Sequence, residues 1–425
     1  MSENTNLIST SLLNPAIVSD PGVSAEQVAR TFKRDKFTWL SYSLLGYYSY
    51  LLALLGPVIA FLVIDFNLDY ITSSLHFSAF ALGMFLAGAS GDRVNRLVGR
   101  SMTLWGGTLG MAFGTLLLVL SAGPVQSVAG VFLMGLLGSW LLVTVQSSLS
   151  DHHGHQRGIA LTEANIIASF GSSLSAWVIG FAANTVLGWR FSLWLVGPVV
   201  LAFLLIFKGQ GAPALPPTRQ ATESTFNAAT FTASNTRKKR LPAIFWLFWL
   251  VGFLAVSTEW CVGFWGVDFL NKVGGLSKSN SALVMGLYFV IIVFSRIVVS
   301  RLIRHFAANV LLPLSAAFIL VGFPVFWLVP NPFISIPSLL FMGLGIANLV
   351  PLNVPAAISL APAQADLISA RLTSASGLAL LVSPFALGWL ADLVGIQQAF
   401  GFIMILATSM FGLMLVGYFK TRKAV

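Results

Sequence analysis

The sequence predicts an all-α membrane protein with about twelve transmembrane helices in two six-helix, pseudo-symmetric halves. Of its 425 residues, 56% are hydrophobic and only 9% are charged, whereas soluble proteins contain about 25% charged residues. Apolar runs of about 20 residues, the length that crosses a bilayer, recur along most of the chain. One long polar segment near the middle separates two stretches of similar length, and this predicts the two halves.

The apolar runs define the expected domain organisation. In order, they begin near Phe37, Tyr70, Ser101, Val125, Ile159, Phe191, Ala243, Ser279, Asn309, Phe333, Ile368 and Gln397. We therefore expect an N-terminal tail over residues 1–36, a first half over 37–208, a central loop over 209–241 and a second half over 242–425.

The placement of basic residues predicts the orientation. Lys and Arg gather in loops on one side of the expected spans, and basic loops face the cytoplasm. Both termini and the central loop should then be cytoplasmic, in an inner or plasma membrane. The net charge of +10 comes from these loops and the tails, so we expect contact with a lipid bilayer and no nucleic-acid binding. Arg190, Lys272 and Lys278 are exceptions on the outer side.

A charged turn between the second and third expected spans carries a motif. The turn reads Gly88-Ala89-Ser90-Gly91-Asp92-Arg93-Val94-Asn95-Arg96. A glycine followed four residues later by Asp-Arg and then by another basic residue resembles the signature of the major facilitator superfamily, with Asn95 where that family usually has glycine. In the second half, Ser295-Arg296 with Arg301 and Arg304 resembles a degenerate copy.

The resemblance implies two similar halves with the substrate bound between them near mid-membrane. It also implies that charges near the cytoplasmic level lock the inner face shut, with Asp92 accepting hydrogen bonds from the opposite half in the outward-open state. The residues expected in this cytoplasmic gate are Gly88, Asp92, Arg93, Arg96, Arg296 and Arg371. For the last two, snorkelling to the headgroups is the alternative.

Ionisable residues inside spans are candidates for function because they are costly there. Glu259 lies near the middle of the seventh span, on a stripe of small residues, and we expect it to couple proton flow to transport; the alternative is a structural hydrogen bond to a neighbouring helix. Glu163, near the start of the fifth span, is a second candidate for coupling or gating, and the alternative is that it complements the helix dipole. His76 could titrate near neutral pH or simply bond a loop.

A further set of aromatic and neutral polar residues is expected to line the substrate cavity. This set is Tyr50, Asn165, Trp260, Trp265, Tyr288, Asn348 and Asn353. Pro351 and Pro355 in the tenth span free backbone carbonyls, which neighbouring asparagines or cavity water must satisfy. Tyrosines near span ends are also common interface anchors.

Other functions are disfavoured by the sequence. The run Asp151-His152-His153-Gly154-His155 has metal-ligand chemistry, but incidental loop histidines are the better interpretation, so we expect no metal and no cofactor. No catalytic motif is present, so we expect no enzyme. Many drug exporters of the family carry an arginine in the fourth span and a Gly-Pro pair in the fifth, and both are missing here.

These observations predict a secondary transporter that moves a small organic solute by alternating access, driven by protons and acting as a monomer. A neutral or cationic solute suits the expected cavity better than a doubly charged anion, because the expected lining contains one acid and no obvious central arginine. A drug or metabolite efflux antiporter and a non-transporting sensor on the same fold are the alternatives.

Overall fold

The computed structural model describes residues 32–213, 241–303, 305–306, 308–361 and 364–422. The chain divides into two units at residues 35 and 36, and the following description concerns the second unit, residues 36–425. Most of the expected N-terminal tail and central loop therefore lies outside the described residues.

The second unit is built from helices alone in the described residues. In chain order they are α2 (Lys36–Phe66), α3 (Tyr70–Val98), α4 (Arg100–Val119), α5 (Pro124–His153), the short 3-10 turn η2 (Gly154–Gln156), α6 (Arg157–Ala183), α7 (Phe191–Trp194), α8 (Val196–Ile206), α10 (Phe245–Lys272), α11 (Lys278–Leu302), α12 (Ala308–Leu328), α13 (Pro332–Ile358), α14 (Ala365–Val394), α15 (Ile396–Ala399) and α16 (Gly401–Arg422).

Eleven of the helical segments in the described residues are long and apolar enough to cross a membrane. The sixth expected span is the shorter apolar segment Phe191–Ile206, which is split into α7 and α8 at Leu195. Pro198 explains the split, because it has no backbone N–H to donate to the carbonyl of Trp194. The predicted all-α membrane fold is thus confirmed.

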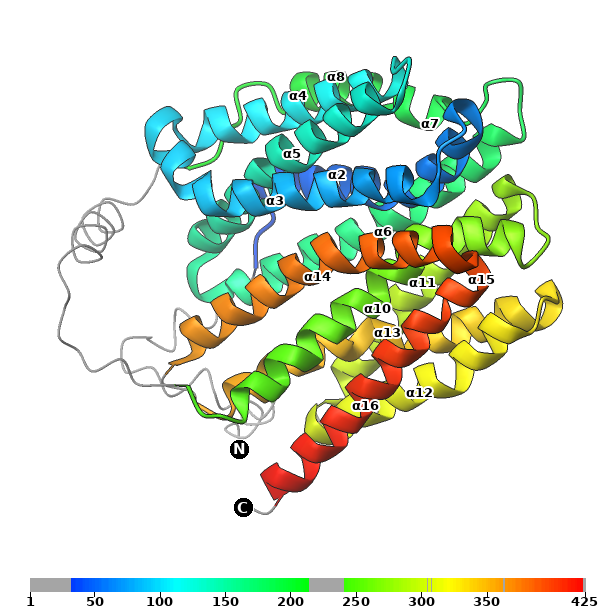
Figure 1. Ribbon diagram of the computed structural model, residues 1–425. Coiled ribbons are helices and arrows are strands. Elements are labelled where there is room, and N and C mark those ends of the chain that lie inside the picture. Colours follow the sequence, from blue (N-terminus) through cyan, green and yellow to red (C-terminus); the bar gives the residue numbers. More distant parts are fainter. Residues whose placement is uncertain (1–31, 214–240, 304, 307, 362–363, 423–425) are drawn as a thin grey trace, which may run out of the picture. The chain divides into compact units, whose positions relative to one another are not determined.

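Two groups of helices, α2–α8 and α10–α16, form the halves (Figure 1). Across the boundary, α3 packs against α14 and α6 against α11, while α2 contacts α10. Within the first half, Gly114 of α4 and Gly130 of α5 face each other so closely that an added Cβ on either would lie 2.7 or 2.8 Å from the other's carbonyl oxygen. Small residues at such crossings let helices pack through backbone contacts.

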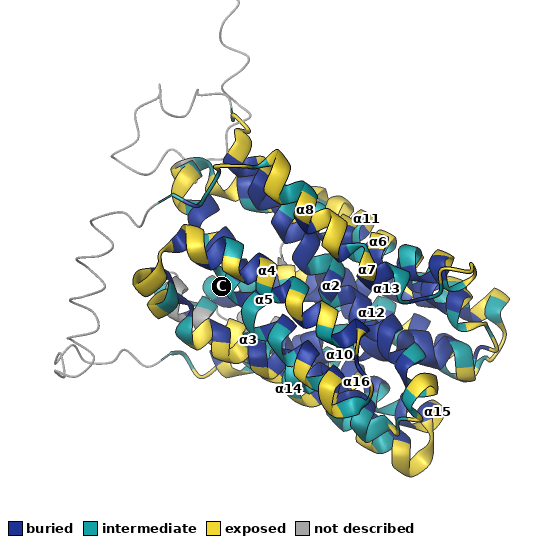
Figure 2. Ribbon diagram, turned by 90° about the horizontal axis from the view of Figure 1, so that it is seen from above, coloured by how far each residue is buried: buried dark blue, intermediate teal, exposed yellow. Residues whose placement is uncertain are grey.

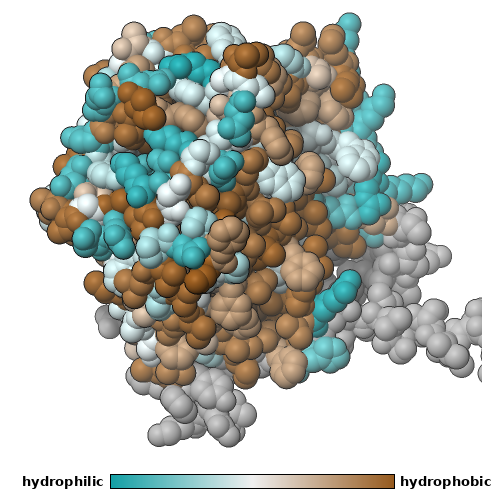
Figure 3. Space-filling view, turned by 90° about the vertical axis from the view of Figure 1, so that its right-hand side faces the viewer, coloured by the Kyte–Doolittle hydropathy of each residue, from teal (hydrophilic) through white to brown (hydrophobic). Residues whose placement is uncertain are grey.

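The surface of the bundle agrees with a bilayer environment. Buried residues line the inward faces of the helices, whereas many residues on the outside are exposed (Figure 2). Large apolar side chains such as Phe85, Val125 and Phe333 are among the exposed ones. In the space-filling view, a broad hydrophobic surface separates regions where hydrophilic side chains gather (Figure 3). An exposed apolar surface of this extent is expected to face lipid.

Asp69 begins α3 as its N-cap, and its carboxylate accepts a hydrogen bond from the backbone N–H of Thr72 at 2.7 Å. Hydrogen bonding from Thr72 holds the pKa of Asp69 below its ordinary value. This cap fixes where the chain re-enters the bundle after the α2–α3 turn.

Candidate functional site

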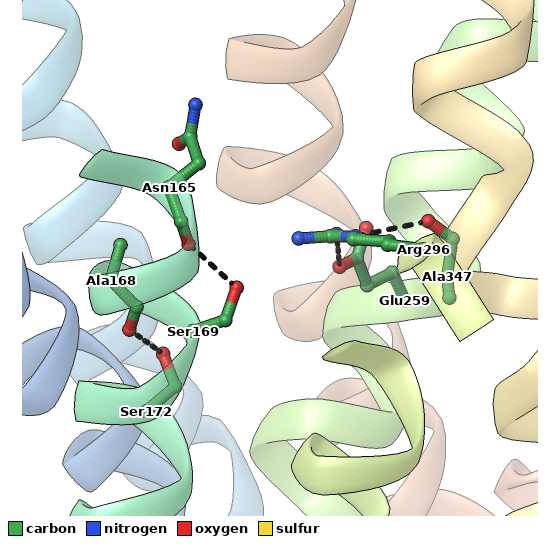
Figure 4. Close-up of polar contacts among 7 residues, drawn as sticks. All are labelled: Asn165, Ala168, Ser169, Ser172, Glu259, Arg296 and Ala347. Carbon is green, nitrogen blue, oxygen red and sulfur yellow. Dashed lines mark hydrogen bonds and ion pairs between the residues drawn. The ribbon is translucent and has the colours of Figure 1, made fainter. Parts of the chain in front are cut away.

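The central feature of the second half is an ion pair between α10 and α11. Arg296 Nη2 lies 3.4 Å from Glu259 Oε1, and Arg296 Nε donates a hydrogen bond to the carbonyl oxygen of Ala347 on α13 at 3.1 Å. The Glu259 side chain is 20% exposed and that of Arg296 37%. Three helices thus hold one carboxylate and one guanidinium in a position that solvent can still reach (Figure 4).

The pair has further polar support from its own half. Asn348 Nδ2 donates to Ser295 Oγ at 2.7 Å and to the carbonyl oxygen of Leu344 at 2.8 Å, and Ser295 Oγ donates to the same carbonyl. Tyr288 is fully buried within electrostatic range of both charges, and its hydroxyl has no hydrogen-bond partner among the described residues. Two expected cavity residues, Asn348 and Tyr288, therefore lie in the packing behind the pair.

Across from the pair lies a polar face of α6 (Figure 4). Ser169 Oγ donates to the carbonyl oxygen of Asn165 at 2.9 Å, and Ser172 Oγ donates to that of Ala168 at 3.3 Å. The hydroxyl proton of Ser169 is used within the helix and that of Ser172 lies between the carbonyl oxygens of Ala168 and of Ser49 on α2, so the lone pairs of both hydroxyls remain for a ligand. Asn165 is exposed on this face, and its Nδ2 donates to the carbonyl oxygen of Leu161 at 2.9 Å.

Two of the three expected coupling residues lie away from this centre. His76 is completely buried between α3 and α5, where Nε2 lies 2.8 Å from Ser127 Oγ and Nδ1 lies 3.1 Å from the carbonyl oxygen of Thr72. Glu163 accepts a hydrogen bond from the hydroxyl of Tyr42 at 3.0 Å. His76 has a helix-packing role in this geometry, and Glu163 joins α6 to α2.

The remaining residues that were expected to line the substrate cavity lie in different surroundings. Trp265 is only 1% exposed, and its indole N–H donates to the carbonyl oxygen of Pro384 at 3.0 Å. It therefore belongs to the packing between α10 and α14 and not to an open cavity. Tyr50 donates to the carbonyl oxygen of Ser192 at 2.8 Å and anchors α7. Trp260 is half-buried beside Phe264, and Asn353 lines a small cavity described below.

We call the end of the bundle with the α2–α3 and α10–α11 turns the closed end, because hydrogen bonds join the halves there. The carboxylate of Asp392 on α14 accepts from the backbone N–H groups of Tyr70 and Ile71 at 2.8 and 2.7 Å. Lys272 donates to the hydroxyl of Tyr70 at 2.7 Å, and Lys278 donates to the carbonyl oxygen of Ala60.

Sequence reasoning missed this cluster as a functional feature, although two signals were present. Lys272 and Lys278 break the charge bias of the loops, and buried Asp268 stands four residues before Lys272, the spacing of a helical ion pair. Asp268 and Lys272 form this ion pair, with Asp268 Oδ2 3.3 Å from Lys272 Nζ. The third exception, Arg190, pairs with Asp65 at 2.7 Å inside the first half.

The opposite end, which we call the open end, carries most of the expected gate. Asp92, Arg93, Arg96 and Arg371 are exposed there, and Gly88 has open space around it. Asn95 is buried and accepts a hydrogen bond from Thr144 at 2.9 Å, so this departure from the family motif joins α3 to α5. Arg296 does not lie with these residues, since its guanidinium reaches Glu259 instead.

The histidine-containing run at the end of α5 has other contacts. Asp151 pairs with buried Arg100 at 2.7 Å, and His153 lies 2.8 Å from the hydroxyl of Thr38. Within the part of the chain that the structure describes, no group of three or more His, Cys, Asp or Glu residues is arranged to hold a metal ion.

Comparisons with known proteins agree with this architecture. The crystal structure of a bacterial homologue of the human lysosomal transporter Spinster, in an inward-facing and occupied conformation, matches with a TM-score of 0.70 at 13% identity, over 91% of this chain and 97% of that chain. The nucleoside transporter NupG matches with a TM-score of 0.71 at 11% identity, over 90% and 98%. A D-xylose–proton symporter matches at 0.62 and 15% identity, over 85% and 95%.

These likenesses concern the fold, because all three identities are low. No curated protein sequence matches the chain. The family profile described as Major Facilitator Superfamily matches residues 38–370, which is most of the sequence. The chain is therefore a multi-pass membrane transporter that belongs to the major facilitator superfamily.

Proposed function

We propose that this protein is a proton-coupled secondary transporter of a small, neutral or cationic organic solute. The observation that carries the proposal is the Glu259–Arg296 pair, partly exposed opposite the polar face of α6. A charged pair is costly among transmembrane helices, and such groups mark ion and substrate pathways. The proton-coupled solute symport named for one structural neighbour is consistent with this function.

The pair provides a chemical means of coupling. While Glu259 is ionised, the guanidinium of Arg296 is held between that carboxylate and the carbonyl oxygen of Ala347. Protonation of Glu259 removes the charge attraction, so Arg296 becomes free to interact with acceptors across the gap, where α6 presents the lone pairs of Ser169. A proton and a solute would then change the same interaction, which is what coupling requires.

The nature of the solute follows from the charge balance. One carboxylate and one guanidinium leave the paired centre neutral, and no further charged side chain contacts either of them among the described residues. A doubly charged anion would find no unpaired cation in this wall. Hydroxyl and carbonyl groups of the lining favour a solute that forms hydrogen bonds.

We also propose that the closed end faces the exterior, so that this conformation is inward-facing with both termini in the cytoplasm. The basis is the excess of Lys and Arg at the open end, including Arg93, Arg96 and Arg371. The membrane would then be the inner or plasma membrane, and a monomer contains the complete pathway between its halves.

The test is solute flux into proteoliposomes with an imposed pH gradient. Solutes would first be selected by their ability to stabilise the purified protein against heat. A coupled transporter accumulates the selected solute only when the gradient is present, and dissipating the gradient with a protonophore abolishes accumulation. Equilibration that ignores the gradient would exclude proton coupling, and absence of flux would favour a sensor on the same fold.

A further inference from the structure

A cavity of about 140 Å³ lies among α10, α13 and α14, separate from the Glu259–Arg296 pair. One ordered water needs only about 15 Å³ of such space, so the cavity exceeds the requirement of a single water. Its lining residues are Gly252, Val350, Asn353, Val354, Ser369, Leu372, Thr373 and Ser376. Gly252 precedes Glu259 by two helical turns, about 10 Å toward the open end.

The amide of Asn353 leaves an unused acceptor in this lining. Its side chain is 2% exposed, and Nδ2 donates to the carbonyl oxygen of Phe248 at 3.0 Å. A carbonyl can only accept, so the orientation of the amide is fixed by this bond. Asn353 Oδ1 is then buried without a hydrogen-bond partner among the described residues, which is costly unless a ligand supplies a donor.

Two hydroxyls of α14 add acceptors. Thr373 Oγ1 donates to the carbonyl oxygen of Ser369 at 3.0 Å, and Ser376 Oγ donates to that of Leu372 at 3.2 Å. Their protons are engaged by their own helix, so each offers lone pairs to the cavity. No charged residue belongs to the lining. Apart from the hydroxyl of Ser369, which can turn either way, and the second N–H of the Asn353 amide, the polar side-chain groups of the cavity are acceptors.

We infer that this cavity binds a group that only donates hydrogen bonds, namely the primary ammonium of a small organic solute. An alkylammonium has three N–H donors and no acceptor, which matches the three acceptors of Asn353, Thr373 and Ser376. A carboxylate would meet further acceptors. The inference rests on the proposed function, because it takes the cavity to receive part of the transported solute on its way to Glu259.

Binding can be measured without transport, by saturation-transfer NMR on the purified full-length protein with n-butylammonium as the probe. The matched probes are n-butyltrimethylammonium, which keeps the charge but has no N–H donor, and butyrate. We expect n-butylammonium to bind and both matched probes to bind at least about tenfold more weakly, as loss of charged hydrogen bonds implies. Equal binding of the two ammonium probes, or no binding of n-butylammonium, would overturn the inference.

Variants assign the binding to this cavity. Thr373→Val with Ser376→Ala removes two acceptors and keeps the bond between Asn353 and Phe248, so we expect binding to weaken by about tenfold. The control is Ser374→Ala with Thr408→Val, two exposed hydroxyls outside the lining that also donate to carbonyls of their own helices. If the Thr373→Val, Ser376→Ala variant binds n-butylammonium as tightly as the wild type does, the inference is contradicted even if flux is proton-coupled. Binding that depends on the cavity without any flux contradicts the proposed function alone.

Discussion

The two ends of the bundle differ in how the halves meet. At the closed end, side chains of one half bond backbone groups of the other, as Asp392 does with the first turn of α3 and Lys278 with Ala60. At the open end, the acid and basic residues of the family motif are exposed. The difference indicates that a few polar contacts, together with close helix packing, hold the halves in this conformation. The contribution of each contact should then be measurable by removing it in a single variant.

The largest effect is expected from Asp392→Ala, which removes the two backbone hydrogen bonds to α3. The closed end should open at least about tenfold more often, since ~1.4 kcal/mol is tenfold in population. A cysteine introduced by Ser74→Cys, at the seam with Gly388, reports opening by its rate of maleimide labelling in a Cys261→Ser background.

The control for that experiment is Asp65→Ala. Asp65 is also an acid at the closed end, but its partner Arg190 belongs to the same half. Labelling of the Ser74→Cys reporter should stay at the wild-type rate. If both acid variants accelerate labelling equally, Asp392 has no special part in holding the halves together.

The next largest effect is expected from Gly56→Ala. An added Cβ would lie 2.7 Å from the carbonyl oxygen of Gly263 across the α2–α10 contact, and a backbone atom cannot turn aside as a side chain can. The helices must separate, so we expect labelling at the Ser74→Cys reporter to rise several-fold. Gly106→Ala, with nothing near its added Cβ, should leave the rate unchanged.

A smaller effect is expected from Tyr70→Phe. The substitution removes the hydrogen bond from Lys272 but keeps the ring, whose centroid lies 4.4 Å from the ammonium nitrogen. Loss of one such bond costs about 1 kcal/mol or less, so opening should increase by roughly threefold. Tyr50→Phe, which loses a bond within one half, is the comparison, and an equal increase there would contradict a cross-half role.

The smallest effect is expected from Asp69→Ala, which removes the cap of α3 and costs about 1 kcal/mol of stability. Because hydrogen bonding lowers the pKa of Asp69, its contribution is present at neutral pH and is lost as pH falls through that lowered pKa. Melting curves of wild type and variant should therefore begin to converge below about pH 4, the ordinary range of an aspartate pKa, and meet only below the lowered pKa. A constant difference at all pH values would show that the carboxylate charge is irrelevant.

Much of the fold could be predicted from the chain, because hydrophobic runs and the exclusion of charge from lipid act on each helix separately. The division at Leu195 was not predicted, because the sixth run is continuously apolar and its hydropathy gives no sign of a break, although Pro198 accounts for it. The candidate site was harder to predict from the sequence than the fold. Glu259 stood out by its depth, but its partner Arg296 comes from another helix, and only packing sets that distance.

The dependence on helix packing also explains why some residues have contacts that differ from their predicted roles. His76 has the chemistry of a proton-coupling group and Trp265 that of a cavity lining, yet partners on α5 and α14 use their polar atoms. Conversely, the role of Asp392 could not be read from the residue alone, because it depends on α3 lying beside α14. Residue type limits what a side chain can do, and helix packing decides which of those interactions it makes.

The central claim is that Glu259 couples proton movement to solute movement, and Glu259→Gln tests it most directly. The amide mimics the protonated carboxyl, and its size is unchanged. We expect the variant to exchange solute between equal concentrations across the membrane but to lose accumulation driven by a pH gradient. Glu163→Gln is the matched control, since that acid is bonded to Tyr42 within the first half. Accumulation at the wild-type rate by Glu259→Gln would show that Glu259 is structural and contradict the claim.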